Sequence, residues 1–211
     1  MTCMNSLPLS TTSYAEDKED LLIAEYCAGS RIPIVSYLEI GTNHPIISNN
    51  TYFFYRRGIR GVLAEPYFGK WQVIQENRPE DVLIKAGIWH DKTPVARFKK
   101  RGRNGGGSYC TTKDYPSLPL VPLVYVNDVF EKYFKNGPPT LISIDIEGNE
   151  INLLKEIDLS GRHRIPVICV ETNKPSQLPI TPYLEGLGYR LLHKTTANSI
   201  FACDTLSKFG G

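Results

Sequence analysis

Short apolar runs alternate along most of the chain with segments whose apolar residues recur at helical spacing. The runs predict buried strands, and the spaced segments predict helices that cover them. The first strand is expected at 35–40, where Val-Ser-Tyr-Leu-Glu-Ile leads into Gly41. Further strands are expected at 61–66, 81–88, 140–145 and 167–171. Strands that alternate with helices predict an α/β fold with a mostly parallel sheet.

Helices are expected between these strands, and a pair of strands is expected at the end. The helical segments are 17–27, 48–57, 67–75, 127–133, 150–157 and 181–187, and Asn127 is the expected cap of the fourth. The last strands, at 189–193 and 199–203, are expected to pair antiparallel at one edge of the sheet. No repeat and no linker divides residues 1–211, so we predict a single domain.

The middle of the chain departs from this alternation. Residues 95–99 alternate like an exposed strand, and 121–126 form a second short apolar run. Between them, residues 99–108 are basic and rich in glycine and cannot bury enough apolar surface to order themselves alone. We predict a mobile insertion or lid at 99–120. Residues 1–13 are expected to be a loose lead-in.

Composition narrows the class of protein. The chain has 211 residues, of which 41% are hydrophobic and 22% charged, as in ordinary soluble domains. A net charge of +2 does not by itself indicate a nucleic-acid partner. The five cysteines are widely spaced, and Cys169 and Cys203 lie in apolar strands, which predicts reduced core thiols and a cytoplasmic location. No apolar run is long enough for a membrane span.

The turn after the first strand points to a class of ligand. A dinucleotide fold would carry G-x-G-x-x-G here, which brings a pyrophosphate to a helix N-terminus. This turn has one glycine, Gly41, and a carboxylate just before it, Glu39. That pattern suits a ligand with a positive group and no phosphate. S-adenosylmethionine (SAM) is the common cellular ligand of this kind.

Four acids share one position in the predicted sheet, because each ends a buried strand: Glu39, Glu65, Asp145 and Glu171. Ligands of open α/β sheets bind beyond these strand ends. We expect the turn of Glu39, Gly41, Thr42 and Asn43 to hold the methionine part of SAM. Glu65, followed by Pro66, is placed to accept the ribose hydroxyls. Gly87 and Ile88 would pack on the adenine, and Asp145 would face the sulfonium.

Several segments together carry a resemblance to a known family. They are 13–22, Leu38–Pro45, Ser48–Tyr55, Arg57–Pro66 and, most specifically, Leu-Ile-Ser-Ile-Asp-Ile-Glu-Gly-Asn-Glu at 141–150, followed by Val170-Glu171. In these segments the chain resembles the FkbM-type SAM-dependent methyltransferases. The resemblance implies a Rossmann-like class I fold with a seven-stranded sheet whose last strand is antiparallel. It also implies SAM as cosubstrate and O-methylation of a hydroxyl on a sugar, a polyketide or another small metabolite.

Two features depart from the family pattern. Family members often have aspartate where this chain has Glu39, and the basic loop at 99–108 has no counterpart that we can place. The acceptor is therefore expected to be a small molecule or glycan, without further identification. We expect its site to come from the N-terminal helix, the 89–120 segment and the loop at 172–179. No membrane is expected, and the protein could be a monomer or a homodimer.

Methyl transfer to a hydroxyl needs alignment and removal of a proton. We expect Asp145 to orient the acceptor hydroxyl or take its proton, assisted by Glu147 or Glu171. His44 is the second candidate base; the alternative is a loop histidine that caps the next helix. His90 could also reach the pocket or be a surface histidine.

A metal site is the main chemical alternative. Asp145, Glu147, Glu150 and Glu171 could gather Mg²⁺, which prefers carboxylate oxygens. Acids at a helix start also stabilise the helix dipole without any metal, so we do not favour a metal.

Two further functions stay open. An RNA-directed methyltransferase would use the basic loop at 99–108, although nucleic acid is not the expected partner. A non-catalytic SAM-binding module would bind SAM without turnover. The aromatic run at 52–55 is expected to be helix core rather than a binding platform.

Overall fold

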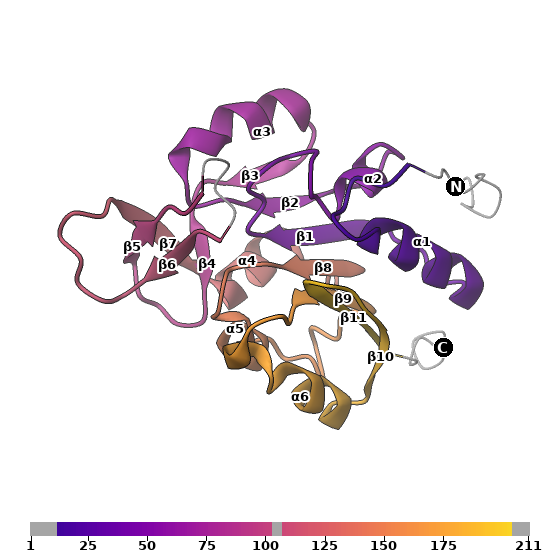
Figure 1. Cartoon of the computed structure of the whole chain (residues 1–211). Coiled ribbons are helices and arrows are strands. Elements are labelled where there is room, and N and C mark those ends of the chain that lie inside the picture. The colour runs from indigo at the N-terminus through magenta and orange to yellow at the C-terminus, as the bar shows by residue number, and fades with distance from the viewer. Residues whose placement is uncertain (1–11, 103–106, 204–211) are drawn as a thin grey trace.

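The structure is a computed structural model that describes residues 12–102 and 107–203. Most of the expected lead-in, 1–11, and the centre of the basic loop, 103–106, lie outside the described residues. Seven strands form one sheet in the order β10-β11-β9-β8-β1-β2-β3 (Figure 1). Their bounds are β1 Ser36–Ile40, β2 Arg60–Ala64, β3 Val82–Ile84, β8 Leu141–Ile144, β9 Val167–Glu171, β10 Tyr189–Lys194 and β11 Asn198–Cys203.

All neighbouring strands of this sheet pair parallel except those that involve β11, which is antiparallel to both β9 and β10. The Rossmann-like class I fold, with seven strands and the last one antiparallel, is therefore confirmed. The chain builds β1, β2 and β3 outward from the centre and then returns to place β8 on the other side of β1. This reversal between β1 and β8 is where doubly wound sheets bind ligands.

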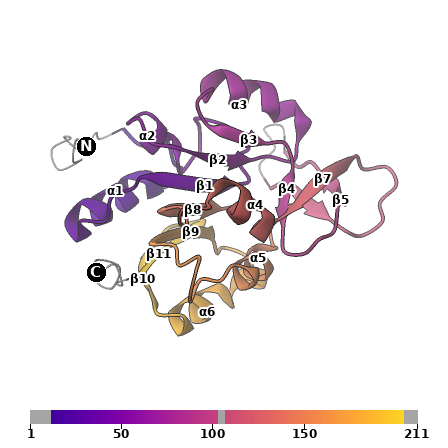
Figure 2. The ribbon, with the colours of Figure 1, turned by 180° about the vertical axis from the view of Figure 1, so that it is seen from behind.

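Helices cover both faces of the sheet. The helices α1 Glu19–Ser30, α2 Tyr52–Tyr55 and α3 Trp71–Asn77, the last preceded by the 3₁₀ turn η1 Phe68–Lys70, pack on one face. The helices α4 Val126–Tyr133, α5 Glu150–Glu156 and α6 Ile180–Gly186 pack on the other. Seen from behind, α4 lies across β8 and β1 (Figure 2). Along β1 the side chains alternate between these two cores, as period-two strands require.

A second, four-stranded sheet in the order β4-β7-β5-β6 stands at the end of the molecule away from α1 (Figure 1). Its strands are β4 Gly87–Trp89, β5 Val95–Lys99, β6 Tyr109–Thr111 and β7 Leu120–Tyr125. Part of the 99–120 segment is therefore in strands, and its mobility stays a prediction.

The prediction of a single strand at 81–88 is wrong. The chain forms β3, leaves the main sheet over two residues, and then forms β4 in the second sheet beside β7. The last bond between β3 and its neighbour runs from the Glu65 amide to the Ile84 carbonyl, and the next amide on that side, of Tyr67, donates instead to the Glu65 side chain. Gly87 then packs tightly on Leu123 of β7.

Two helix predictions also need correction. The helix expected at 48–57 is only the single turn Tyr52–Tyr55, because the Asn49 side chain accepts hydrogen bonds from the Thr51 and Tyr52 amides and shapes a turn there. Asn127 does not cap α4: it lies inside the helix, and its side chain donates to the Tyr125 hydroxyl and the Glu156 carbonyl.

Other expectations are confirmed. The strand at 167–171, the antiparallel closing pair and the buried aromatic residues of 52–54 are as predicted. Cys169 and Cys203 are buried free thiols. Within the part of the chain that the structure describes, every helix is too short or too polar to cross a membrane.

Candidate functional site

A pocket opens at the carboxyl ends of β1, β2 and β8, between them and the second sheet. Its enclosed volume is about 80 Å³, and the rest of the hollow is open to solvent. Eight of the predicted site residues line it: Gly41, Asn43, Glu65, Pro66, Gly87, Ile88, Asp145 and Glu147. Glu39, Thr42, His44 and Glu171 lie outside the lining that the described residues form.

Gly41 lies where the turns after β1 and β8 meet beside this pocket. It has a φ of +89°, and a β-carbon built there would lie 1.9 Å from the Asp145 carbonyl oxygen. The Gly41 amide donates to Ala64, and the Asp145 amide donates to Ile40. A glycine is required here because the turns after β1 and β8 press together, whatever ligand the pocket takes.

Two other pocket residues have left-handed backbones although they are not glycine. Asn43 has a φ of 49° and Glu147 a φ of 66°. Such conformations cost free energy and persist where the surroundings hold them. Both follow the ends of the central strands, so this unusual backbone helps to shape the pocket.

Glu65 is held rigidly in the pocket wall. Its two carboxylate oxygens accept hydrogen bonds from the Asn43 amide at 2.8 Å and the Tyr67 amide at 2.7 Å. Burial raises the pKa of Glu65, and these amides and Lys70 oppose that rise. The second lone pairs of its oxygens are oriented acceptors of the kind that the expected ribose contact needs.

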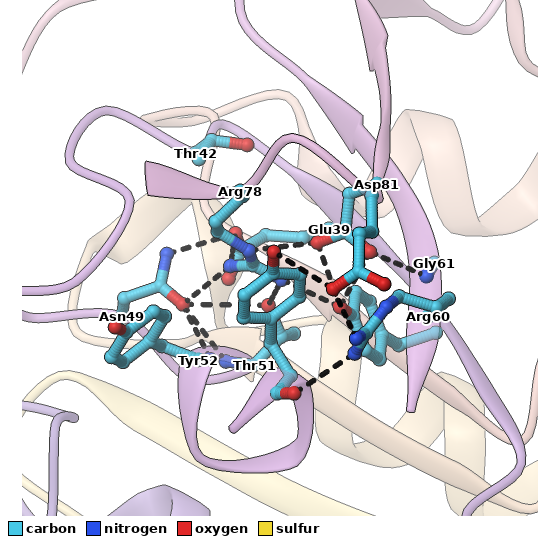
Figure 3. A network of polar contacts seen from close by, with 12 residues as sticks. Glu39, Thr42, Asn49, Thr51, Tyr52, Arg60, Gly61, Arg78 and Asp81 are labelled. Atoms are coloured by element: carbon cyan, nitrogen blue, oxygen red, sulfur yellow. Dashed lines mark hydrogen bonds and ion pairs between the residues drawn. The ribbon is translucent and has the colours of Figure 1, made fainter. Parts of the chain in front are cut away.

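Glu39 belongs to a buried network on the α2 and α3 side of the sheet (Figure 3). Its carboxylate accepts from the Asn49 amide group at 2.9 Å and lies 3.6 Å from the Arg78 guanidinium. Arg78 is only 1% exposed. It also donates to Asp81, Tyr37, Thr51 and Asn49, at 2.8, 2.8, 2.9 and 3.1 Å. Burial raises the pKa of Glu39, and Arg78 and Asn49 oppose the rise.

The expected contact between Glu39 and the methionine part is therefore not what this geometry favours. The carboxylate is committed to Asn49 and Arg78, so its contribution to the pocket is to fix the turn that follows β1. Thr42 is likewise buried, with its amide bonded to the Ala64 carbonyl at 3.1 Å. Of this turn, Gly41 and Asn43 face the pocket.

An aromatic and basic wall closes the pocket on the side of the second sheet. Tyr67 and Phe98 stack with ring centroids 5.4 Å apart, and the Lys100 ammonium lies 5.2 Å from the Tyr67 ring. Lys70 and Tyr109 also line this wall. Sequence reasoning placed acceptor contacts in 89–120 but named none of these residues, because the fold and not the spacing brings Tyr67 and Phe98 together.

Four carboxylates gather on the opposite side, from the turn after β8 and the end of β9: Asp145, Glu147, Glu150 and Glu171. The Asp145 side chain is exposed into the pocket that it lines. Protein atoms crowd its carboxyl group and raise its pKa well above the usual range, and the charges on Glu171, Glu147 and Glu150 raise it further. A carboxylate of this kind accepts a proton more readily than an ordinary one.

Sequence reasoning missed Lys174, whose ammonium bonds to both Glu147 and Glu171. It also missed Gln177, which is buried and donates to Glu171 at 2.8 Å. The signal available was the proximity of both residues to Glu171 within the 172–179 loop, which was expected to contribute to the acceptor site.

The two histidines have local partners. His44 Nδ1 accepts from the Ile46 and Ile47 amides, at 3.1 and 3.0 Å, so it caps the turn that follows it and not the next helix, α2, which begins at Tyr52. Burial and the Lys70 charge lower the pKa of His44. His90 Nδ1 lies 2.8 Å from the Asn149 amide nitrogen. Neither lines the pocket formed by the described residues, and the role of His44 as a base stays a prediction.

The carboxylates fit a divalent ion poorly. Asp145, Glu150 and Glu171 each bring an oxygen within 4.8 Å of the others. However, Glu150 already accepts from the Ile146 and Gly148 amides, and Glu171 already accepts from Lys174 and Gln177. An ion bound here would have to compete with the Lys174 ammonium for Glu171 and with backbone amides for Glu150.

Comparisons with known proteins agree with this architecture. Residues 39–191 match the family model described as the methyltransferase FkbM domain. A structure of methyltransferase FkbM from Methylobacillus flagellatus superposes with a TM-score of 0.50 at 14% identity, over 90% of this chain and 56% of that one. Cofactor-bound Rv0187 from MTB superposes with a TM-score of 0.50 at 12% identity, over 93% and 84%.

A third structure, assigned as an O-methyltransferase from Klebsiella pneumoniae, gives a TM-score of 0.50 at 14% identity, over 92% of this chain and 83% of that one. At these identities the likeness shows the fold. No curated protein matches the sequence.

Proposed function

The chain belongs to the FkbM family of SAM-dependent methyltransferases, and from this premise we propose that it methylates a hydroxyl oxygen of a small-molecule or glycan acceptor. The observation that carries the proposal is the placement of Glu65 and Asp145 in one pocket, on either side of the Gly41 turn. Glu65 offers fixed acceptors to a ribose, and Asp145 offers a carboxylate of raised pKa to a hydroxyl.

The pocket residues suit SAM in chemistry as well as in place. Glu65 would accept from the ribose hydroxyls, Gly87 and Ile88 would pack on the adenine, and the Gly41–Asn43 turn would lie along the methionine part. No phosphate-binding glycine loop stands in this turn. When bound, SAM supplies a methyl group on a positively charged sulfur, which is a good leaving group.

The chain's own task is to position the acceptor and remove its proton. Asp145 accepts a hydrogen bond from the acceptor hydroxyl and takes its proton as the new carbon–oxygen bond forms and the carbon–sulfur bond breaks. The pair of electrons from that bond stays on sulfur, so the second product is S-adenosylhomocysteine. Asp145 then returns its proton to solvent. The aromatic wall of Tyr67 and Phe98 offers a face for a ring of the acceptor.

Calorimetric titration with SAM and with S-adenosylhomocysteine tests the cosubstrate site. Wild-type protein is expected to bind both, and Glu65→Ala is expected to lose affinity by about tenfold or more because the ribose loses its charged acceptor. Glu80→Ala is the matched control, because Glu80 is an exposed acid paired with Arg60. Absence of binding by the wild type would remove the proposed function.

A further inference from the structure

Both the side-chain ammonium and the backbone amide of Lys174 are bonded within the carboxylate cluster. Its ammonium donates to Glu147 of the β8 turn and to Glu171 at the end of β9. Its backbone amide donates to the Gln177 side chain at 2.9 Å, and the Gln177 amide group donates to the other oxygen of Glu171 at 2.8 Å. The turn after β9 is therefore closed around Glu171.

The cluster needs a positive charge. Glu171, Glu147 and Glu150 act electrostatically on Asp145, and Lys174 is the cation that acts on it most strongly. When all five groups are ionised, four negative charges and one positive charge leave a formal charge of −3. Burial lowers the pKa of Lys174, but its bonds to Glu147 and Glu171 outweigh burial and raise the pKa. The lysine thus stays charged where the acids require it.

The carboxylates differ in what satisfies them. Glu150 is bound by the Ile146 and Gly148 amides, while Glu147 and Glu171 share the ammonium. Asp145 is left facing the pocket. Of the four acids, two are therefore paired with one cation, one is held by backbone amides, and one faces the pocket.

We propose that Lys174 is the internal cation of this cluster, that it occupies Glu171, one of the three carboxylates that a divalent ion would need, and that it positions Asp145 for proton removal without a metal. Lys174 ties Glu147 and Glu171 to the turn after β9. Asp145 remains the group that exchanges a proton. The role of Asp145 rests on the proposed function; the role of Lys174 as a replacement for a metal does not.

Titration with MgCl₂ alone tests the replacement. Removing the ammonium in Lys174→Ala leaves carboxylates without their cation, so this variant is expected to bind Mg²⁺ at least about tenfold more tightly than the wild type. Lys174→Arg keeps the charge and is expected to behave like the wild type. Lys155→Ala is the matched control, since Lys155 is an exposed lysine on nearby α5. Circular dichroism and SAM titration verify that each variant folds.

Two results would overturn the proposal: wild-type protein that binds Mg²⁺ as tightly as Lys174→Ala, or a folded Lys174→Ala variant that gains no Mg²⁺ binding. Both can be read without an acceptor. If the proposed methyl transfer fails altogether, this titration still decides the role of Lys174.

A pH profile tests the positioning of Asp145. Without Lys174, the remaining acids make Asp145 harder to ionise, so the acidic limb of the rate profile is expected to move to higher pH in Lys174→Ala. Lys174→Arg should restore the wild-type limb, and MgCl₂ should restore it in Lys174→Ala. A loss of rate without movement of the limb would mean that Lys174 only supports the fold.

Discussion

Glu39 and Asp145 stand at the carboxyl ends of the adjacent strands β1 and β8, yet their surroundings differ. Glu39 is 4% exposed and lies in a buried network (Figure 3). In this network Arg78 forms ion pairs with the carboxylates of Glu39 and Asp81. Asp145 faces the pocket, and three other acids surround it with Lys174 as cation. A carboxylate at a strand end is therefore not enough to identify a reactive group.

The difference lies in how each charge is compensated. Around Glu39, hydrogen bonds from Asn49 and the charge of Arg78 oppose the cost of burial, and little is left to offer a ligand. Around Asp145, the nearest acids add to that cost, so the group holds a proton more readily. The first arrangement secures the turn that shapes the pocket, and the second supplies a proton acceptor inside it.

The largest expected effect is on turnover. Asp145→Asn keeps the shape of the side chain but cannot take a proton, so kcat is expected to fall by about 10²- to 10⁴-fold with SAM affinity unchanged. Glu39→Gln is expected to lose less than about tenfold, because Glu39 does not face the pocket. Steady-state kinetics with an accepted hydroxyl compound measure both.

Asp128→Asn, a change of an exposed acid on α4, is the control for this experiment. If a folded Glu39→Gln variant loses as much turnover as Asp145→Asn, the contrast between the two strand-end acids is wrong. If Asp145→Asn loses affinity for SAM but not turnover at saturation, Asp145 is a cosubstrate ligand and not the base.

The next effect is on stability. Arg78→Met leaves Glu39 and Asp81 buried without their cation, and the free energy of unfolding is expected to fall by about 3–5 kcal/mol. Arg60→Met removes an exposed pair with Glu80 and is expected to cost no more than about 1 kcal/mol. Urea denaturation of both variants measures the difference. Equal costs would show that the network does not organise this end of the sheet.

The sequence predicted the frame of the site better than its details. Apolar runs and the Gly41 turn were enough to place β1, β8 and β9, because a buried strand needs a continuous apolar run whatever surrounds it. The break between β3 and β4 was missed, since it depends on a distant partner, β7, and on the Tyr67 amide, which donates to the Glu65 side chain and not to the chain after β3. The single-domain prediction, the cytoplasmic location and the oligomeric state stay predictions.

The sequence pattern did not predict the orientation of each acidic side chain at the strand ends. Glu39 is the acid of the most recognisable turn, but Arg78, which decides its orientation, lies far along the chain in a segment with no signal of its own. The same holds for Lys174, whose contact with Glu147 joins two loops that only the fold brings together. Spacing predicts which strand end an acid occupies, and tertiary contacts decide which way it points.

The smallest expected effect is on how stability depends on pH. Burial and then the charges of Glu171, Glu147 and Glu150 raise the pKa of Asp145 in the folded protein. An acid whose pKa is raised by folding stabilises the folded state while it is protonated, in full below about pH 4. This stabilisation is lost as pH rises through the pKa that the acid has in the folded state. Asp145→Asn cannot ionise. Relative to the wild type, the variant is therefore expected to gain stability as pH rises from acid to neutral.

For Asp158, stability is expected to depend on pH in the opposite direction. The Arg162 amide donates to its carboxylate and lowers its pKa, so its ionised form favours folding and that contribution is lost as pH falls. Asp158→Asn should thus lose stability relative to the wild type at neutral pH and approach it in acid. Glu39→Gln should follow Asp145→Asn with a smaller gain, since Arg78 opposes the rise at Glu39. Urea denaturation across this pH range measures the stability of all three variants against the wild type. If the difference in stability between Asp145→Asn and the wild type did not change with pH, the neighbours of Asp145 would not act on it as the structure indicates.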